Sequence, residues 1–217
     1  MVIFAIILGL SPSFIWLYFF LKEDIHPEPK KMIFKVFVFG ALFALLAVPF
    51  EYFFQGYLGF FNIGKYHFIS FLALAAVEEI SKFFAAFWVV KKSRFFDEPV
   101  DAMIYMITAA LGFAALENFF IAFGNINGAS MAIGEIMGII IFRFIGATLL
   151  HALSSGVVGY YWAKKLSLLK GLAVASILHA IFNYLIIMFD EKLIYSTIFL
   201  IIVALFIFWD FEKLKQA

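Results

Sequence analysis

Cysteine is absent from this chain of 217 residues, and charged residues make up only 14% of it. Without cysteine the protein has no structural disulfide, no thiolate metal ligand and no catalytic thiol. The low charge excludes an ordinary soluble domain, whose surface needs far more charged side chains. Proline is also scarce, with five residues, and none of them lies in the four apolar runs that carry the polar motifs described below.

Apolar residues dominate the composition: 65% of the chain is hydrophobic, and its mean hydropathy is +1.04. Segments of about 20 apolar residues are long enough to span a bilayer as helices, and the alternating ten-residue pattern of a membrane barrel is not seen. The sequence therefore predicts an all-α, polytopic membrane helix bundle of about seven transmembrane helices. It forms a single integral membrane domain over residues 1–217 of a multi-pass protein of the cell membrane. The apolar runs cover residues 2–21, 32–54, 66–90, 102–123, 136–163, 171–189 and 193–209.

The distribution of Lys and Arg around these runs predicts the orientation, since cytoplasmic loops carry the positive excess. Seven spans place only Lys65 and Lys192 on one side of the membrane. The N-terminus is therefore expected outside and the C-terminus in the cytoplasm. The basic clusters are interpreted as topology signals, so no nucleic-acid partner is expected. The cytoplasmic set is Lys22, Lys30, Lys31, Lys35, Lys91, Lys92, Arg94, Lys164, Lys165, Lys170, Lys213 and Lys215.

Ionisable and amide side chains within the apolar runs are confined to four consecutive helices. A charge at the centre of a membrane helix costs about 2.5–3.5 kcal/mol, so residues of this kind indicate function. Each must face protein or water, which predicts one shared polar cavity in a catalytic core at about residues 66–189. In chain order the four helices carry Glu78, Glu79 and Lys82, then Glu117 and Asn118, then Arg143 and His151, then His179 and Asn183.

Helical spacing arranges these residues further, because positions four apart share a face. Lys82 can neutralise Glu78 or, three residues away, Glu79, which leaves the other carboxylate free for chemistry. The same interval separates His179 from Asn183. Arg143, Ala147, His151 and Ser155 form another such row.

The chemistry that needs this set of side chains is hydrolysis. A carboxylate can take a proton from water, while imidazoles hold a metal or stabilise an oxyanion. Zinc suits such a site, because two histidines and one carboxylate with an open fourth position are a common catalytic zinc set. Its ligands would come from separate helices, since no HExxH motif is present.

Four sequence elements resemble, in order, the motifs of the PrsW family of intramembrane proteases, related to the CAAX prenyl endopeptidases and the bacteriocin-processing membrane enzymes. The similarity covers about residues 77–183. The first element, EEISK, contains the paired glutamates Glu78 and Glu79, and the second, FAALEN, contains Glu117, where the prenyl endopeptidases carry histidine. The third runs from Arg143 through the HALSSG segment that begins at His151, and the fourth is the HAIFN segment that begins at His179.

The resemblance implies cleavage of a peptide bond in or near the membrane, by a glutamate-activated water with help from histidine, asparagine or a metal. Implied partners are the lipid bilayer and a membrane protein or peptide substrate, such as a membrane-anchored anti-sigma factor. We therefore predict an intramembrane endopeptidase, either a metalloprotease or a glutamate protease. Glu78 or Glu79 is the expected general base and Asn183 an oxyanion donor. The tentative metal ligands are Glu117, His151 and His179, and the supporting residues are Lys82, Asn118 and Arg143.

Two other functions use the same residues. A proton-coupled transporter also relays protons through buried Glu and His, and an inactive protease-like protein could serve as a membrane scaffold. Ser154 and Ser155 are interpreted as small residues for close helix packing, with a serine-protease role as the lesser alternative. Glu51 and Glu135 are expected near helix ends, in contact with solvent.

Overall fold

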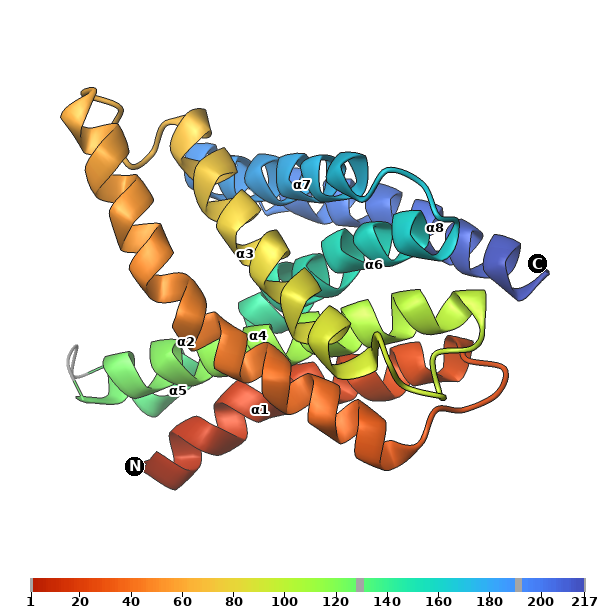
Figure 1. Ribbon diagram of the computed structural model, residues 1–217. Coiled ribbons are helices and arrows are strands. Elements are labelled where there is room, and N and C mark those ends of the chain that lie inside the picture. Colours follow the sequence, from red (N-terminus) through yellow and green to blue (C-terminus); the bar gives the residue numbers. More distant parts are fainter. Residues whose placement is uncertain (1, 128–130, 190–192, 217) are drawn as a thin grey trace.

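The computed structural model describes residues 2–127, 131–189 and 193–216, and in these ranges every regular element is helical (Figure 1). The all-α prediction is therefore confirmed. Lys192, which the orientation argument uses, lies outside the described residues. In chain order the elements are α1 (Val2–Phe20), the 3-10 turn η1 (Leu21–Glu23), α2 (Lys30–Phe60), α3 (Phe68–Val90), α4 (Pro99–Asn127), α5 (Ile133–Arg143), the π-helical turn η2 (Phe144–Thr148), α6 (Leu149–Ala163), α7 (Leu168–Met188) and α8 (Ile194–Lys215).

Six helical stretches of the described chain are long and apolar enough to cross a membrane, and α5, η2 and α6 together form one of them. The remaining long helix, α3, has 23 residues and carries the three charges of Glu78, Glu79 and Lys82. Its length is sufficient for a span, since about 20 residues cross the hydrocarbon core. The count of seven spans stays a prediction that depends on α3.

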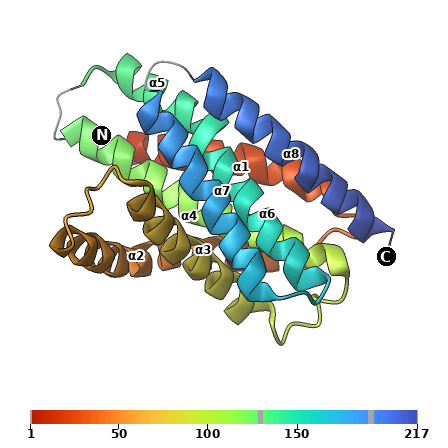
Figure 2. The ribbon, with the colours of Figure 1, turned by 90° about the horizontal axis from the view of Figure 1, so that it is seen from above.

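Helix α4 lies at the centre of the bundle, in contact with α1, α2 and α6 (Figures 1 and 2). Its residues from Val100 to Ala115 are almost all buried, as expected of a helix that is apolar on every side. The four helices that carry the polar motifs are neighbours, because α4 packs on α6, α6 on α7, α7 on α3 and α3 on α4. This closed arrangement brings residues about 100 positions apart in the sequence into one place.

Two glycines set the distance between α2 and α4. A Cβ atom built on Gly40 would lie 2.0 Å from the carbonyl oxygen of Ala109, and one built on Gly112 would lie 2.0 Å from the carbonyl oxygen of Phe37. Small residues at membrane helix crossings allow the backbones to touch, where packing replaces the hydrophobic effect as the source of stability. The crossing therefore tolerates no side chain at either position.

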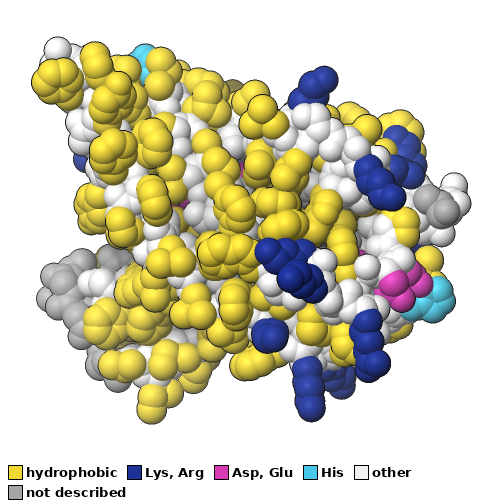
Figure 3. Space-filling model, viewed as in Figure 1, with side chains coloured by type: hydrophobic (Ala, Val, Ile, Leu, Met, Phe, Trp, Pro, Cys, Tyr) yellow, Lys and Arg dark blue, Asp and Glu magenta, His cyan; other side chains and the backbone are white. Residues whose placement is uncertain are grey.

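Lys and Arg side chains gather mainly toward the end of the bundle that holds the C-terminus (Figure 3). An ion pair of 2.7 Å between Lys215 and Glu23 joins α8 to η1 at this end. The arrangement is the one expected if this end faces the cytoplasm, and the orientation of the termini stays a prediction.

The structure corrects the expected position of Glu51. Helix α2 continues to Phe60, so Glu51 lies inside it and not near its end. Gly40, Ala44 and Ala47 form the buried face of α2, and Glu51 is four residues after Ala47 on the same face. The carboxylate therefore points toward the bundle.

A Gly40→Ala substitution should lower the stability of the folded protein by about 1–3 kcal/mol, because overpacking forces the backbones of α2 and α4 apart. The matched control is Gly56→Ala in the same helix, where a Cβ meets nothing within 4 Å. Thermal unfolding in detergent measures both variants. Equal melting temperatures would show that the crossing is not as close as described.

Candidate active site

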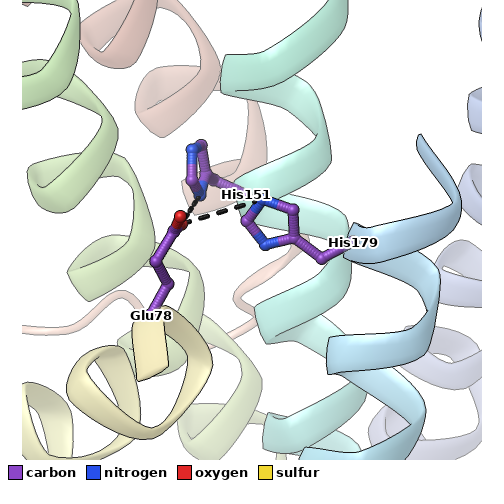
Figure 4. Close-up of side chains that lie close together, drawn as sticks. All are labelled: Glu78, His151 and His179. Atoms are coloured by element: carbon purple, nitrogen blue, oxygen red, sulfur yellow. Dashed lines mark ion pairs between the residues drawn. The ribbon is translucent and has the colours of Figure 1, made fainter. Parts of the chain in front are cut away.

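Three helices direct one side chain each to a common point in the bundle (Figure 4). The carboxylate oxygen Oε2 of Glu78, on α3, lies 3.8 Å from Nδ1 of His151, on α6, and 3.7 Å from Nε2 of His179, on α7. The two imidazole rings are perpendicular, with centroids 5.0 Å apart. Oε2 of Glu78 is buried and accepts no hydrogen bond among the described residues. An unpaired buried carboxylate oxygen is costly, and here it faces two nitrogen atoms that can share a proton or a cation with it.

Glu79, the next residue, has the opposite environment. Its side chain is fully buried, and Oε1 accepts hydrogen bonds from Lys82 Nζ at 2.8 Å, Ser154 Oγ at 2.9 Å and His179 Nδ1 at 2.9 Å. Oε2 accepts one more from Ser155 Oγ at 2.9 Å. A carboxylate has about four lone-pair positions, so Glu79 is fully occupied as an acceptor. It is therefore placed to hold other groups and not to take a proton from water.

Lys82 is also fully buried and supplies the positive charge of the site. Its Nζ lies 2.8 Å from Glu79 Oε1, 2.6 Å from His151 Nδ1 and 3.5 Å from Glu78 Oε2. The ammonium group has three donors, and it faces three acceptors. The sequence predicts that Lys82 neutralises one of the two glutamates; in the structure Lys82 lies near both, with the closer contact to Glu79.

These partners determine the protonation pattern of the two histidines. Lys82 can only donate, so Nδ1 of His151 is the acceptor and Nε2 carries the hydrogen that is donated to Glu117 at 2.9 Å. Carboxylates accept, so Nδ1 of His179 donates to Glu79, and its Nε2 lone pair faces Glu78. A carboxylate behind an imidazole fixes the tautomer and raises the basicity of the opposite nitrogen. His179 thus presents a lone pair to the centre of the site.

Glu117 and Asn118 are held by Arg143 on the other side of His151. Arg143 Nη2 lies 3.1 Å from Glu117 Oε2, and its Nε donates to Oδ1 of Asn118. The amide of Asn118 donates in turn to Thr148 Oγ1 at 3.0 Å, which joins α4 to η2. Arg143, which the sequence predicts as a supporting residue, is thus the counter-ion of Glu117. The side chain of Glu117 is 30% exposed, against 11% for Glu78, so water reaches Glu117 most easily.

The row that the sequence predicts from Arg143 to His151 is interrupted, because residues Phe144–Thr148 form a π-helical turn. The extra residue in this turn changes the angle between Arg143 and His151, and both still reach Glu117. The carbonyl group of Phe144 accepts a hydrogen bond of 2.8 Å from the indole of Trp16, on α1. Single π-turns within α-helices occur frequently at functional sites.

Asn183 follows His179 by one turn of α7 and makes no hydrogen bond among the described residues. Its side chain lines a cavity of 710 Å³ between α5, η2, α7 and α8. Arg143 lines the same cavity, whose other walls are mostly apolar, with Phe142, Phe182 and Ile186 among them. The cavity thus begins about one helical turn from the centre of the site.

The side chains at the centre fit a metal ion as a ligand set. Glu78, His151 and His179 offer one carboxylate oxygen and two imidazole nitrogens that all lie within 4.8 Å of one another. Oε2 of Glu78 accepts no hydrogen bond in the described part of the chain and is free to bind a cation. Two histidines and one carboxylate with an open position are typical of catalytic zinc. Glu117, the carboxylate predicted for this role, lies at the other nitrogen of His151 and is outside this group.

Sequence reasoning missed three residues that support the site. The sequence pattern predicts helix packing for Ser154 and Ser155 and gives no role to Thr148. Their hydroxyl groups bond to Glu79 and Asn118. Adjacent serines on a helix ordinarily bond to their own backbone, so the sequence pattern alone carries no sign of this role.

Replacing Ser155 by Ala should lower the free energy of unfolding by about 1–3 kcal/mol, because it leaves a buried oxygen of Glu79 unpaired. Ser176→Ala is the matched control, since Ser176 is buried on α7 and bonds only to Leu172 O in its own helix. Unfolding in detergent measured by denaturant titration compares the two. A control variant as unstable as Ser155→Ala would contradict the role of Ser155.

Comparison with known proteins gives consistent matches. The sequence profile of a family described as PrsW family intramembrane metalloprotease matches residues 28–209. Similar proteins named Protease PrsW come from Bacillus subtilis (strain 168), with 30% identity over 99% of this chain and 96% of the relative, and from Geobacillus kaustophilus (strain HTA426), with 28% identity over 96% and 90%. A third, from Oceanobacillus iheyensis, is 27% identical over 96% of this chain and 94% of the relative. No solved structure matches.

The family match covers most of the chain, including all four polar helices, and its relatives are similar over nearly their full length. It favours a protease over the transporter and the scaffold that the same residues allow. Together with six apolar helices long enough to span a membrane, the match identifies a multi-pass membrane protein. This chain belongs to the PrsW family of intramembrane proteases.

Proposed function

We propose that this protein hydrolyses a peptide bond in or near the membrane-embedded region of a membrane protein, with Glu78 as the general base. The observation that carries the proposal is Oε2 of Glu78, which is buried between two imidazoles and accepts no hydrogen bond from any described residue. Glu79 is the less suitable base, because four hydrogen bonds already occupy its oxygens. The two adjacent glutamates thus have different proposed roles, because one is fully hydrogen-bonded and the other is not.

In the proposed reaction, Glu78 accepts a proton from a water molecule, and the water oxygen attacks the carbonyl carbon of the scissile bond. The tetrahedral intermediate then collapses, the carbon–nitrogen bond breaks, and Glu78 returns the proton to the leaving amine. Lys82, whose Nζ lies 3.5 Å from Glu78, stabilises the negative charge that develops on the oxygen atoms during the reaction. Glu79 holds both Lys82 and His179 in place for this step.

Asn183 is the proposed donor to the developing oxyanion. Its amide has no hydrogen-bond partner among the described residues and lies on the same face of α7 as His179. The cavity of 710 Å³ that Asn183 lines would hold the apolar segment of the substrate next to the scissile bond. When a substrate helix unwinds, its peptide carbonyl loses the hydrogen bond that it accepts within the helix. The amide of Asn183, which lacks a partner among the described residues in an apolar wall, can donate a hydrogen bond to that carbonyl, and both groups are then satisfied.

The family description implies a metal, and Glu78, His151 and His179 would hold it. A bound zinc ion supplies a Lewis acid and lowers the pKa of a bound water. If Glu78 were bound to the metal, Glu117 would be the carboxylate that accepts the proton, since it contacts His151 and is partly exposed. Lys82 competes with the metal for Nδ1 of His151, because its Nζ lies 2.6 Å from that atom.

The substrate class remains part of the proposal. A membrane-anchored regulator such as an anti-sigma factor is one candidate, and the relation to the prenyl endopeptidases stays a prediction from the sequence motifs. The extents of the single domain, residues 1–217, and of its catalytic core, about residues 66–189, are likewise predictions.

A Glu78→Gln variant should cleave single-span peptides in liposomes at a rate lower by about 10²–10⁴-fold, since it removes the general base, while its melting temperature stays close to that of the wild type. Glu79→Gln should lose both cleavage and stability, because a buried ion pair with Lys82 is broken. Glu212→Gln, on an exposed part of α8, is the control. Full activity of Glu78→Gln would exclude Glu78 as the base.

Zinc binding tests which residues form a metal site. Equilibrium dialysis of the purified protein should show one bound zinc for the wild type and for Glu117→Gln, and none for His179→Ala, because His179 but not Glu117 belongs to the group of three ligands. Loss of zinc in Glu117→Gln would favour the ligand set predicted from the sequence. No binding by the wild type would favour glutamate-activated water without a metal.

A further inference from the structure

Glu51 is a carboxylate inside a membrane helix for which the proposed reaction has no use. It lies on the face of α2 that packs on the bundle, one turn after Ala47, whose neighbours include Phe113 and Leu116 of α4 and Val77 of α3. The residues that follow these neighbours are Glu117 and Glu78. In agreement, Glu51 interacts electrostatically with Glu78, Glu117 and Lys82.

The carboxylate of Glu51 has no hydrogen bond and no ion pair with any described residue, and its side chain is only partly buried. A charged or polar group at membrane depth without a protein partner is tolerated where it faces a water-filled cavity. Glu117 and Glu78 are also partly exposed, at 30% and 11% of their side chains. The side chains of these three carboxylates, on α2, α3 and α4, are thus each partly accessible from outside the bundle.

Polar and small residues follow Glu51 along one face of α2 toward the end of the bundle. Gln55 and Gly59 follow Glu51 at intervals of four residues, so all three share a face of α2. Gln55 and Gly59 line a cavity of 400 Å³ whose other walls are Asn62, Ile63, Gly64, Lys65 and Ser70. Beyond Ala47, α2 loses its fully buried positions, and it separates from α3 toward the loop that joins them (Figure 1).

The space-filling view shows acidic atoms at the surface of this face (Figure 3). Small areas of magenta are visible between the apolar side chains of the face on which α2 and α3 lie (Figure 3). Most Lys and Arg side chains lie at the other end of the bundle.

We propose that the face of α2 formed by Glu51, Gln55 and Gly59 is the path by which water reaches the catalytic carboxylates, from the α2–α3 loop and not from the end rich in Lys and Arg. Glu51 is the inner end of this path, where it keeps water ordered beside Glu78 and Glu117. The proposal rests on the proposed hydrolysis, which consumes one water per bond. It also places the scissile bond on the α2–α3 side of the membrane.

The absence of cysteine permits a direct test, because every introduced cysteine is the only one in the chain. Glu51→Cys and Gln55→Cys lie on the path, and Phe53→Cys, from a side chain 64% exposed on the opposite face of α2, is the matched control. Proteoliposomes are treated with a charged, water-soluble methanethiosulfonate. Thiolates form in water and not in lipid, so the two path cysteines should react about tenfold faster than the control or more.

Equal, slow labelling at positions 51, 53 and 55 would overturn the proposal, because it would place Glu51 and Gln55 in lipid. Labelling needs no cleavage, so the pattern is also measured in a Glu78→Gln background. If wild-type protein cleaves no peptide while the labelling pattern holds, the path stands and the proposed function fails. If cleavage occurs and the pattern is absent, the path fails alone.

The role of Glu51 itself is tested by two substitutions of similar size. Glu51→Leu removes the polar surface at the inner end, whereas Glu51→Gln keeps hydrogen-bonding groups for water there. Cleavage by the Leu variant should be slower than cleavage by the Gln variant by about tenfold, since only the Leu side chain excludes water. Equal rates for the two would remove Glu51 from the path.

Discussion

The burial of an ionised Glu79 is the constraint on which the rest of the structure depends. A fully buried carboxylate is tolerated only with complete pairing, and here α3, α6 and α7 each provide donors to it. Removing one partner of such a group leaves an uncompensated charge, at a cost of about 3–5 kcal/mol. The requirement fixes how closely α6 approaches α3, because two short serine side chains must reach the same carboxylate. The orientations of Lys82 and His179 follow from it.

The three carboxylates of the site differ in how deeply their side chains are buried. The side chain of Glu79 is inaccessible, that of Glu78 is 11% exposed and that of Glu117 is 30% exposed. Their hydrogen bonds differ as well, since Glu79 accepts four and Glu117 two, whereas Oε2 of Glu78 accepts none among the described residues. With Glu51, four carboxylates face the two cations of Lys82 and Arg143. A proton or a cation held between these side chains would compensate the excess of negative charge.

Several features of the site could be predicted from the sequence, because a charge inside an apolar run is visible without any structure. Glu78, Glu79 and Lys82 stand out for this reason, and their spacing indicates a pairing that the structure contains. The choice between the two glutamates could not be made. Adjacent residues on a helix point about 100° apart. Only the packing of α6 and α7 decides which of the two glutamate side chains is shielded from water. The hydrogen bonds of Ser154 and Ser155 to Glu79 could not be predicted for a related reason, since Glu79 lies on another helix.

By itself the sequence determined that this chain is an all-helical membrane protein and which polar side chains lie within its apolar helices. Hydropathy and composition are properties of consecutive residues, and lipid leaves the backbone of an apolar span little choice but a helix. Tertiary structure alone decided the π-turn after Arg143, the tautomers of His151 and His179, and the carboxylate that stays free. These depend on close helix crossings at Gly40 and Gly112 and on hydrogen bonds between residues up to 100 positions apart, for which local sequence has no signal.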